Sequence, residues 1–423
     1  MTDRKNPFPL SELLRHPDLH ESFRPSTPAV QVHGMTGPCV LVIGGGIAGA
    51  GLAYALAARA TVTVLERETH CGYHATGRSA ASFTETYGSP VIRRLAMASR
   101  AFLALPPPGF TASPLLIPRG TLTVARSDQL DALDAMLNDA RRLVPGVHRL
   151  DGDAVLRRVP VLRPGYAAAA MNEPDAMDLD VHGLHLGFLQ GARRAGCQVV
   201  TGAEVAGVDR AAGGWRFRTR AGQVFQADIL VNAAGAWADE VAAMAGVAPL
   251  GLQPKRRTAL TIDLPPGVPG QGWPLVDDVD GEFYFKPDAG ALFMSPADAT
   301  DSPPTDAQPD ELDIAIAVDR LQRATTLQVQ RVRRAWAGLR TFADDGNPVV
   351  GRDDAMDGFV WLAGQGGYGI KTSPALSRIC AAAVLGLPFP PDLSRFGLVE
   401  HSLLPHRLRR ASVPVPAMGA QPQ

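Results

Sequence analysis

The sequence predicts an α/β fold built from two interleaved domains, one around a buried parallel sheet and one, of α+β type, around an antiparallel sheet. A strand, a glycine-rich turn, a helix and a second strand follow one another in residues 39–66. A strand, a run of glycines and a helix return at residues 359–385. Residues 254–327 alternate polar and apolar side chains, which is typical of an antiparallel sheet with one face in water.

The first unit has the spacing of a dinucleotide-binding turn. Cys39–Ile43 is a continuous apolar run, as in a strand buried on both faces, and Thr61–Leu65 is a second β-rich run. Gly44, Gly46 and Gly49 between them fit a G-x-G-x-x-G frame. These glycines permit a tight turn, close approach of backbone to a pyrophosphate, and close packing of the helix on the strand.

The helix expected over Ile47–Arg59 would present free N–H groups and the positive end of its dipole to phosphates. Glu66, about 20 residues after the glycines, is placed to accept a hydrogen bond from a ribose hydroxyl. Because every part occurs in order, the unit is predicted to bind a dinucleotide. The alternative is an ordinary βαβ unit with a glycine-rich turn.

The composition narrows the class of protein. At 423 residues the chain exceeds what one core usually serves, so two domains are expected. The 41 basic and 42 acidic residues give a formal net charge of −1, which argues against a nucleic-acid partner. The four cysteines are scattered without a C-x-x-C pair, so we expect no metal site, no disulfides and a cytoplasmic location. No run approaches the roughly 18 apolar residues of a membrane span.

A loop follows the first unit. It carries Gly77, Arg78 and Ser79, and then the small residue Ala80. Small residues beside an arginine favour a loop and a helix start lying against phosphates. A solvated loop with one surface arginine is the alternative.

Further elements are indicated by periodicity and by turn residues. Helices are expected over Val91–Leu105, Gln129–Leu143, Val181–Ala195 and Ala236–Ala245. Strands are expected over Leu115–Ala125 (a pair turning near Arg119–Gly120), Gln198–Val200, Glu204–Val208, Trp215–Thr219, Val224–Val231, Thr258–Ile262, Glu282–Pro287 and Ala291–Met294. Asp180 is expected to cap the helix that follows it, which explains the acids near His182 and His185 better than a metal site does.

The second glycine element begins at the buried strand Phe359–Ala363. Residues 364–369 hold four glycines, and an apolar helix is expected over Ala375–Leu385. A plain tight turn would not need four glycines. This helix is therefore expected to aim its N-terminus at another part of the same cofactor.

Taken together, the segments VIGGGIAGA, VLERE, GYHATGRSAA, VNAAGAWAD, WAGLRTF and GQGGYGIKTSPALS resemble the D-amino-acid oxidase superfamily of FAD-dependent oxidoreductases. Within it, GRSAASFTETYG, LGLQPKRRTAL, FYFKPDAG and GQGGYGIKTS look most like the bacterial D-arginine dehydrogenase branch. The resemblance covers about residues 38–405. It implies one non-covalently bound FAD across both glycine elements, an amino acid substrate, and an electron acceptor such as oxygen or a quinone.

The resemblance and the element pattern divide the chain into a Rossmann-type FAD-binding domain and a substrate-binding domain. The expected segments are 38–105, 177–253 and 331–390 for the FAD-binding domain, and 106–176 and 254–330 for the substrate-binding domain. Residues 1–37, with one short helix near Leu10–Arg15, and residues 391–423 are expected to be terminal extensions.

The resemblance also implies the site residues. Those expected to bind FAD are Gly44, Gly46, Ile47, Ala48, Gly49, Glu66, Arg67, Arg78, Ser79, Ala80, Val205, Ala234, Gly235, Trp237, Gly367, Tyr368, Gly369, Ile370, Lys371 and Thr372. Those expected to line the catalytic face are Tyr87, Arg257, Tyr284, Arg340 and Gly367.

The expected chemistry explains these residue types. Oxidising an α-amino acid moves the Cα hydrogen as hydride to the flavin, and a substrate amine that arrives neutral needs no strong protein base. The site must then supply orientation. The fork-shaped guanidinium of Arg340 is our choice to hold the substrate carboxylate, with help from Arg257 and Tyr284, while Tyr87 lies near the amine or covers the site. The alternatives are structural ion pairs for the arginines and core positions for the tyrosines.

Some positions depart from the D-arginine dehydrogenase pattern. An acidic residue of that branch, which can pair with a cationic substrate tail, falls at about Thr121, and a histidine falls at about Ser82. Lys371 replaces an amide-bearing residue and is expected beside the flavin. Loss of the acid is expected to weaken binding of a cationic tail by about 2–5 kcal/mol. Glu85 is a possible substitute for it.

The sequence thus predicts an FAD enzyme that dehydrogenates a D-amino acid, giving an imine that water hydrolyses to a 2-oxo acid and ammonia. A sarcosine- or glycine-type oxidase of N-substituted amino acids, or a 2-hydroxy acid dehydrogenase, is the enzymatic alternative. A flavin-bearing assembly or binding factor without turnover is the alternative of another class.

Overall fold

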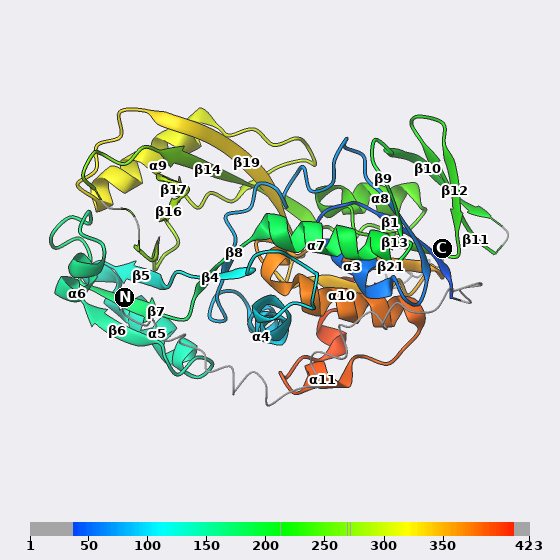
Figure 1. Ribbon diagram of the computed structural model, residues 1–423, viewed down its shortest axis with the longest axis horizontal. Coiled ribbons are helices and arrows are strands. Elements are labelled where there is room, and N and C mark those ends of the chain that lie inside the picture. Colours follow the sequence, from blue (N-terminus) through cyan, green and yellow to red (C-terminus); the bar gives the residue numbers. More distant parts are fainter. Residues whose placement is uncertain (1–36, 212, 269, 271, 410–423) are drawn as a thin grey trace, which may run out of the picture.

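The computed structural model describes residues 37–409 except 212, 269 and 271 (Figure 1). The expected N-terminal extension, with its helix near Leu10–Arg15, and the end of the C-terminal tail lie outside the described residues. Two lobes lie side by side along the long axis, each organised on its own large sheet.

The first lobe is built on a six-stranded sheet in the order β20-β21-β13-β1-β2-β9. Its strands are β1 (Cys39–Ile43), β2 (Thr61–Leu65), β9 (Gln198–Val200), β13 (Ile229–Asn232), β20 (Val349–Arg352) and β21 (Phe359–Ala363). Only β20 runs antiparallel to its neighbour; the other pairs are parallel. The sheet confirms the predicted α/β class and the predicted strands β1, β2, β9 and β21.

One predicted strand of this region is divided in two. The expected run Val224–Val231 forms β12 (Val224–Ala227) and β13, because Asp228 between them bonds the start of β1. The backbone N–H of Cys39 donates to Asp228 Oδ2 at 2.7 Å, and the N–H of Asp228 donates to the Cys39 carbonyl at 2.9 Å. Strand β1 therefore lies beside β13 in the parallel sheet, while β12 joins a separate antiparallel sheet.

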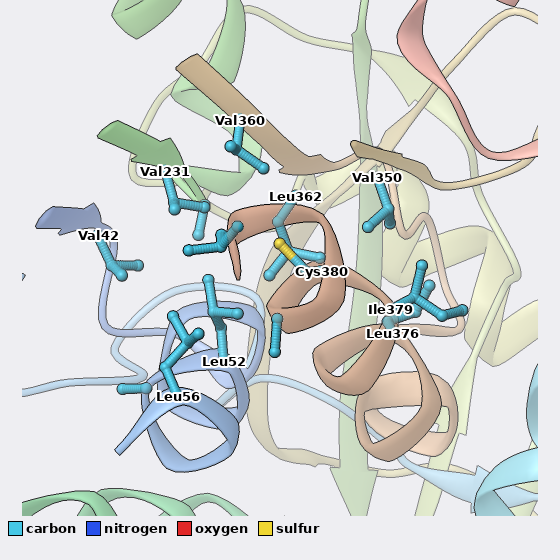
Figure 2. Close-up of a cluster of buried hydrophobic side chains, with 14 of the residues drawn as sticks. Val42, Leu52, Leu56, Val231, Val350, Val360, Leu362, Leu376, Ile379 and Cys380 are labelled. Atoms are coloured by element: carbon cyan, nitrogen blue, oxygen red, sulfur yellow. The ribbon is translucent and has the colours of Figure 1, made fainter. Parts of the chain in front are cut away.

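Helices cover one face of the parallel sheet. They are α3 (Ile47–Leu56), α4 (Pro90–Ala104), α7 (Val181–Arg194) and α10 (Gly369–Leu385). Figure 2 shows Leu52 and Leu56 of α3 and Leu376 of α10 meeting apolar side chains of the strands, among them Val231 and Val360. As predicted, Asp180 caps α7, accepting from the N–H of Gly183 at 2.8 Å.

The other face of this sheet carries a small antiparallel sheet and a short helix. They are β10 (Val205–Ala211), β11 (Gly214–Thr219), β12 and α8 (Ala238–Met244). Trp215 and Phe217 of β11 lie in one apolar cluster with Phe359 and Trp361 of β21. Both faces of the sheet are therefore buried, in keeping with its apolar strands.

Helix α10 begins six residues earlier than predicted and contains Pro374. Proline has no N–H to donate to the carbonyl four residues before it, here that of Ile370. The hydroxyl of Ser373 donates to the Ile370 carbonyl instead, at 3.0 Å. The helix therefore tolerates Pro374, and the glycine turn leads directly into its first residue, Gly369.

The second lobe is built on a nine-stranded sheet in the order β18-β14-β17-β16-β15-β5-β7-β6, with β19 paired to β14. Its strands are β5 (Thr121–Ala125), β6 (His148–Asp151), β7 (Ala169–Glu173), β14 (Gln253–Ile262), β15 (Leu275–Asp278), β16 (Tyr284–Asp288), β17 (Ala291–Ser295), β18 (Thr300–Asp301) and β19 (Val332–Phe342). All pairs are antiparallel except β5 with β15. The antiparallel sheet predicted for residues 254–327 is confirmed for most of the range; β15 has one parallel neighbour, and residues 311–324 form a helix instead.

Helices α5 (Leu130–Arg141), α6 (Gly152–Arg158) and α9 (Glu311–Ala324) pack on the second lobe. The prediction missed α9, which Asp310 caps by accepting from the N–H of Leu312 at 2.9 Å. Residues 331–340, predicted to belong with the FAD-binding segments, form most of β19, which pairs with β14 from Gln253 to Ile262. The domain division otherwise stays a prediction.

A three-stranded sheet of β3 (Ser82–Phe83), β8 (Met177–Leu179) and β4 (Leu116–Pro118) lies between the lobes. The prediction that β4 and β5 pair with each other is wrong, because β4 pairs with β8 and β5 with β7 and β15. The helix start expected near Ala80 is also wrong: the chain turns there and α4 begins at Pro90.

The remaining short helical segments are η1 (Ser127–Gln129), η2 (Gly235–Trp237), α11 (Pro391–Ser394), η3 (Glu400–Ser402) and η4 (Pro405–Leu408). Within the part of the chain that the structure describes, no helix has the length and the apolar character needed to cross a membrane.

The packing of α3 on α10 gives a first prediction. Leu52 is fully buried between the sheet and α10, so Leu52→Ala should lower the free energy of unfolding by about 2–5 kcal/mol in urea denaturation. Leu312 on α9 is 66% exposed, and Leu312→Ala is the matched control, with an expected change below about 0.5 kcal/mol. Equal losses in the two variants would contradict this packing.

Candidate active site

A cavity of about 460 Å³ opens at the carboxyl ends of β1, β2 and β13. This is the edge at which parallel α/β sheets bind ligands. The predicted FAD-binding residues that line it are Gly44, Gly46, Ile47, Ala48, Glu66, Arg67, Arg78, Val205, Ala234, Gly235 and Trp237.

Glycine is required in the first turn for reasons that the geometry shows. Gly44 has a φ of +108°, and a Cβ atom there would overlap the Ala233 carbonyl at the end of β13. A Cβ atom at Gly49 would overlap the Gly44 carbonyl, so the absence of a side chain at Gly49 lets the start of α3 pack against the turn. Gly49 itself does not line the cavity. The turn therefore brings bare backbone to the cavity wall.

The N-terminus of α3 is suited to an anion. Its N-cap is Gly46, which has no side chain to bond the free N–H groups. Thr76 Oγ1 accepts one of them, from Ile47 at 3.0 Å. Gly46 and Ala48 line the cavity here, so remaining amides of the first turn and the helix dipole suit a pyrophosphate.

Glu66 is nearly buried, and both its carboxylate oxygens accept backbone hydrogen bonds. Oε2 accepts from the N–H of Gly45 at 2.8 Å and Oε1 from the N–H of Glu68 at 2.9 Å. A carboxylate oxygen has two acceptor sites, so capacity remains for a ribose hydroxyl. Two backbone amides thus fix Glu66 at the cavity wall before any ligand arrives.

His185 supports the same turn, a role that the sequence did not indicate. Burial lowers the pKa of His185, so its ring is neutral at neutral pH. Its Nε2 lies 2.8 Å from the Gly45 carbonyl, which fits a ring N–H donating to that oxygen. The imidazole also lies against Gly72, where a Cβ atom would be 2.8 Å from it.

A second cavity, of about 110 Å³, adjoins the first. Both cavities are lined by Ile47, Ala75, Thr76, Arg78, Leu339, Gln365 and Gly366, so they share a wall. Predicted residues lining the second cavity are Ile47, Arg78, Ser79, Ala80, Arg257, Tyr284, Arg340, Gly367, Gly369 and Ile370. Residues predicted to bind cofactor and residues predicted to bind substrate therefore meet at this wall.

The second glycine turn is attached to β19 of the other lobe. The N–H of Gly366 donates to the Thr341 carbonyl at 2.8 Å. Gly366 has a φ of +54°, and a Cβ atom there would overlap the Phe342 ring. A Cβ atom at Gly367 would lie 2.9 Å from Arg340 Nη1. The turn and the guanidinium of Arg340 are thus in close contact because neither glycine has a side chain.

The second cavity has a positive electrostatic character. The Nε of Arg257 donates to the Asp298 carbonyl, which fixes this guanidinium. Burial raises the pKa of Tyr284, but the guanidinium groups of Arg340 and Arg257 outweigh burial and leave it below its ordinary value. Among the described residues no carboxylate forms an ion pair with Arg340, whose side chain is half-buried. Such a wall suits the carboxylate of a ligand.

Several predicted residues line neither cavity. They are Gly49, Tyr87, Tyr368, Lys371 and Thr372. Tyr87 is half exposed, with its ring centroid 5.3 Å from that of Tyr368, at the edge of the site.

Lys371 differs from the expectation that it lies beside the flavin. Its Nζ is buried and donates to the carbonyls of Thr84 and Tyr87, each at 2.9 Å, so it holds that loop. Burial lowers the pKa of Lys371 to about 7, against the opposing effect of nearby Glu173. Glu85 is paired with Arg100 and is not available to replace the lost acid.

Arg78 lines both cavities, but its guanidinium already bonds protein oxygens. It donates to the carbonyls of Ala307 and Ala337, each at 2.9 Å, and pairs with Asp306. Sequence reasoning missed Thr76 and Gln365, which also line both cavities. Gln365 stands inside the GQGGYG segment and Thr76 inside GYHATGRSAA, so both motifs were usable signals.

A parallel sheet with a cavity at its carboxyl edge, joined to a smaller cavity with two arginines, defines a dinucleotide-binding protein of two lobes. The family model described as FAD dependent oxidoreductase matches residues 39–383. The chain therefore belongs to this FAD-dependent oxidoreductase family, and FAD is its cofactor. The uncapped α3 terminus, the fixed Glu66 and the two glycine turns fit that group.

Comparison with known proteins gives relatives of two kinds. The chain is 29% identical over 179 residues to FAD-dependent oxidoreductase domain-containing protein 1 of Bos taurus, covering 38% of this chain and 37% of that protein. It is 25% identical over 391 residues to glycine oxidase of Bacillus licheniformis, covering 87% of this chain and 98% of that enzyme. It thus spans well under half of the bovine relative but nearly all of the bacterial one.

The fold is also similar to that of a solved structure. The crystal structure of glycine oxidase from Geobacillus kaustophilus superposes with a TM-score of 0.74 at 25% identity, covering 86% of this chain and 99% of that one.

The second turn gives a test of the site. Gly366→Ala should displace the turn from β19 and sharply reduce the FAD bound per protein, because the added methyl overlaps Phe342. Gly386 after α10 has a similar φ of +65°, and a Cβ atom there would meet only Arg352 Nη2 at 4.0 Å, so Gly386→Ala carries the same backbone cost without the overlap. Bound flavin is read from its absorbance. Full FAD content in Gly366→Ala would show that the turn does not shape the cofactor site.

Proposed function

We propose that the protein is an FAD-dependent dehydrogenase or oxidase that oxidises the Cα–N bond of a D-amino acid or a related amine. The observation that supports this proposal most directly is that Arg257, Tyr284 and Arg340 line one small cavity that shares a wall with the cofactor cavity. The similarity to glycine oxidases over nearly their whole length supports an amino acid substrate.

The residues of this cavity account for binding and orientation. The guanidinium of Arg340, free of carboxylate partners among the described residues, receives the substrate carboxylate through paired N–H donors. Arg257, fixed by the Asp298 carbonyl, and the hydroxyl of Tyr284 complete this anchor. Fixing the carboxylate leaves the rest of the substrate in the small cavity, next to the shared wall.

The same two guanidinium groups influence the protonation state of the substrate amine. Two nearby guanidinium groups and a partly buried cavity disfavour an ammonium, so the amine is bound as the neutral base. The bound FAD would supply the acceptor for the Cα hydrogen and its electron pair. The substrate leaves as an imine, which water hydrolyses to a 2-oxo acid and ammonia.

The substrate side chain is proposed to meet Asp277. This residue pairs with Tyr284 across β15 and β16, so their side chains share one face of the sheet. Asp277 Oδ1 and the nearby Thr121 Oγ1 are buried without a hydrogen-bond partner in the described structure. Neither residue lines the small cavity, but a nitrogen donor at the end of a substrate side chain that reached Asp277 would satisfy its free Oδ1 atom. In this proposal Asp277 of β15 takes the role of the acid that is missing at Thr121 of the neighbouring strand β5.

A glycine- or sarcosine-type activity is the second candidate. The relatives aligned over nearly their whole length are glycine oxidases, and the small cavity holds only about 110 Å³. Such a substrate would leave Asp277 Oδ1 and Thr121 Oγ1 without hydrogen-bond partners.

The decisive experiment for the activity is anaerobic reduction of the holoprotein. Loss of flavin absorbance is followed with basic, acidic and apolar D-amino acids, their L forms, glycine, sarcosine and 2-hydroxy acids. We expect bleaching by D-amino acids, with basic ones fastest. Bleaching only by glycine and sarcosine would establish the second candidate. Bleaching only by 2-hydroxy acids would show that the protein oxidises a C–O bond instead. No bleaching by any of these compounds would indicate a flavin-bearing binding factor without turnover.

Arg340→Met should raise KM by about 30-fold or more while FAD content stays intact, since it removes a charge-assisted pair worth about 2–5 kcal/mol. Steady-state kinetics measure this. Arg333→Met is the matched control, because Arg333 lies on the same strand but is exposed and pairs with Asp263. Unchanged kinetics in Arg340→Met would remove this residue from the carboxylate anchor.

The preference of the enzyme for a substrate with a cationic side chain should depend on pH, because it depends on the charge of Asp277. Burial, with help from Glu173 and Asp278, raises the pKa of Asp277 to about 7. The carboxyl is neutral below that pH and charged above it, so kcat/KM for D-lysine relative to D-norleucine should rise as pH passes through about 7. Taking the ratio cancels ionisation of the α-amine. Asp277→Asn should flatten the ratio, and a ratio unchanged by this substitution would exclude the side-chain contact.

A further inference from the structure

We infer that Asp306, which follows β18 of the second lobe, is a positioning residue that holds the cofactor cavity closed around FAD. It acts through a group of side chains that we call the Asp306 clasp: Asp306, Arg78, Tyr73 and His74. The inference rests on the FAD cofactor of the family and does not depend on the proposed substrate.

Two side chains of the clasp, Arg78 and Tyr73, bond the Asp306 carboxylate, and His74, whose Nε2 bonds Glu68 at 2.9 Å, lies beside it. Arg78 Nη2 pairs with Asp306 Oδ1, and Tyr73 donates its hydroxyl to Oδ2 at 3.3 Å. His74 Nδ1 lies 4.0 Å from Oδ1. The hydrogen bond from Arg78 holds the pKa of Asp306 below its usual value, so the carboxylate is charged at neutral pH.

The position of the clasp connects it to the cofactor. Tyr73, His74 and Arg78 belong to the loop that follows β2 and line one side of the large cavity. Thr305 and Ala307, on either side of Asp306 in the chain, line the same cavity from the second lobe. Two segments more than 200 residues apart in sequence therefore meet at the cavity wall.

The clasped loop also shapes the phosphate end of the cavity. Thr76 on this loop accepts the N–H of Ile47 at the start of α3. The His74 ring lies 4.7 Å from the ring of Trp237, which lines the cavity as well. Displacing the loop would thus change the wall on both sides of the α3 terminus.

The expected consequence is slower cofactor release. Bonds made only while the wall is closed stabilise the closed state relative to an open one and reduce the open population. Asp306 is 46% exposed and Arg78 is 14% exposed, so the pair is partly shielded from solvent. We expect the clasp to slow FAD release by about tenfold, which corresponds to roughly 1.4 kcal/mol.

The test measures FAD release from the holoprotein as the increase of flavin fluorescence after dilution, with no substrate present. Asp306→Asn should release FAD about tenfold faster. Arg78→Gln also removes the bonds to the Ala307 and Ala337 carbonyls, so it should release FAD at least that fast, and adding Asp306→Asn to it should cause little further increase, because the carboxylate acts mainly through Arg78. Asp306→Glu should restore slow release in part. Asp301→Asn is the matched control, with the same change of charge five residues away in an exposed pair with Lys255, and should leave release unchanged.

Thermal unfolding of the apoprotein distinguishes retention from a purely structural contact. Lower apoprotein stability in Asp306→Asn with unchanged FAD release would overturn the inference, as would equal acceleration in Asp301→Asn. If Asp306→Asn does not fold, Tyr73→Phe removes a single hydroxyl of the clasp and should speed release about twofold to fivefold. Release from Tyr73→Phe at the unmodified rate would then overturn it.

Discussion

One hydrogen bond joins the two halves of the site: the N–H of Gly366 donates to the Thr341 carbonyl. It ties the second glycine turn, which belongs to the parallel sheet, to the end of β19 in the antiparallel sheet. Arg340 is consequently placed against Gly367, and the two cavities share a wall. The guanidinium of Arg78 adds to this connection, because it bonds the carbonyls of Ala307 and Ala337 in the second lobe.

The first glycine turn is rigid for a different reason. Its backbone is held from outside by Glu66, His185 and Thr76, each bonding one peptide group of the turn or of the helix start. Such groups fix the direction of the amides before a ligand binds, which reduces the ordering cost of binding. The glycines allow the backbone conformation of the turn, and the hydrogen bonds from these three side chains stabilise that conformation.

Much of the fold could be predicted because local signals were strong. Buried strands such as Cys39–Ile43 and Phe359–Ala363 are short apolar runs bounded by turn residues, and the structure has them at those bounds. Pairing partners could not be predicted, because β4 and β5 adjoin in sequence but join different sheets. The same holds for β19, whose composition does not reveal that its partner is β14.

The site residues also divide into those with a local sequence signal and those whose role depends on tertiary contacts. Residues inside motifs, such as Gly44 and Arg340, line the expected cavities, whereas roles set by tertiary contacts were not visible. Lys371 stands in a motif but its long side chain bonds the carbonyls of Thr84 and Tyr87, away from both cavities. Asp277 carries no motif at all, and only strand register brings it beside Tyr284.

The long pairing of β14 with β19 has a mechanical consequence. Eleven residues of β19 run from the outer part of the second lobe to the glycine turn of the first (Figure 1). The end of this ribbon reaches the first lobe, where the Gly366 N–H bonds the Thr341 carbonyl and Gln365 forms a bridge with Phe342. A swing of one whole lobe would have to break these bonds and those of Arg78 to Ala307 and Ala337, so opening of that kind is disfavoured.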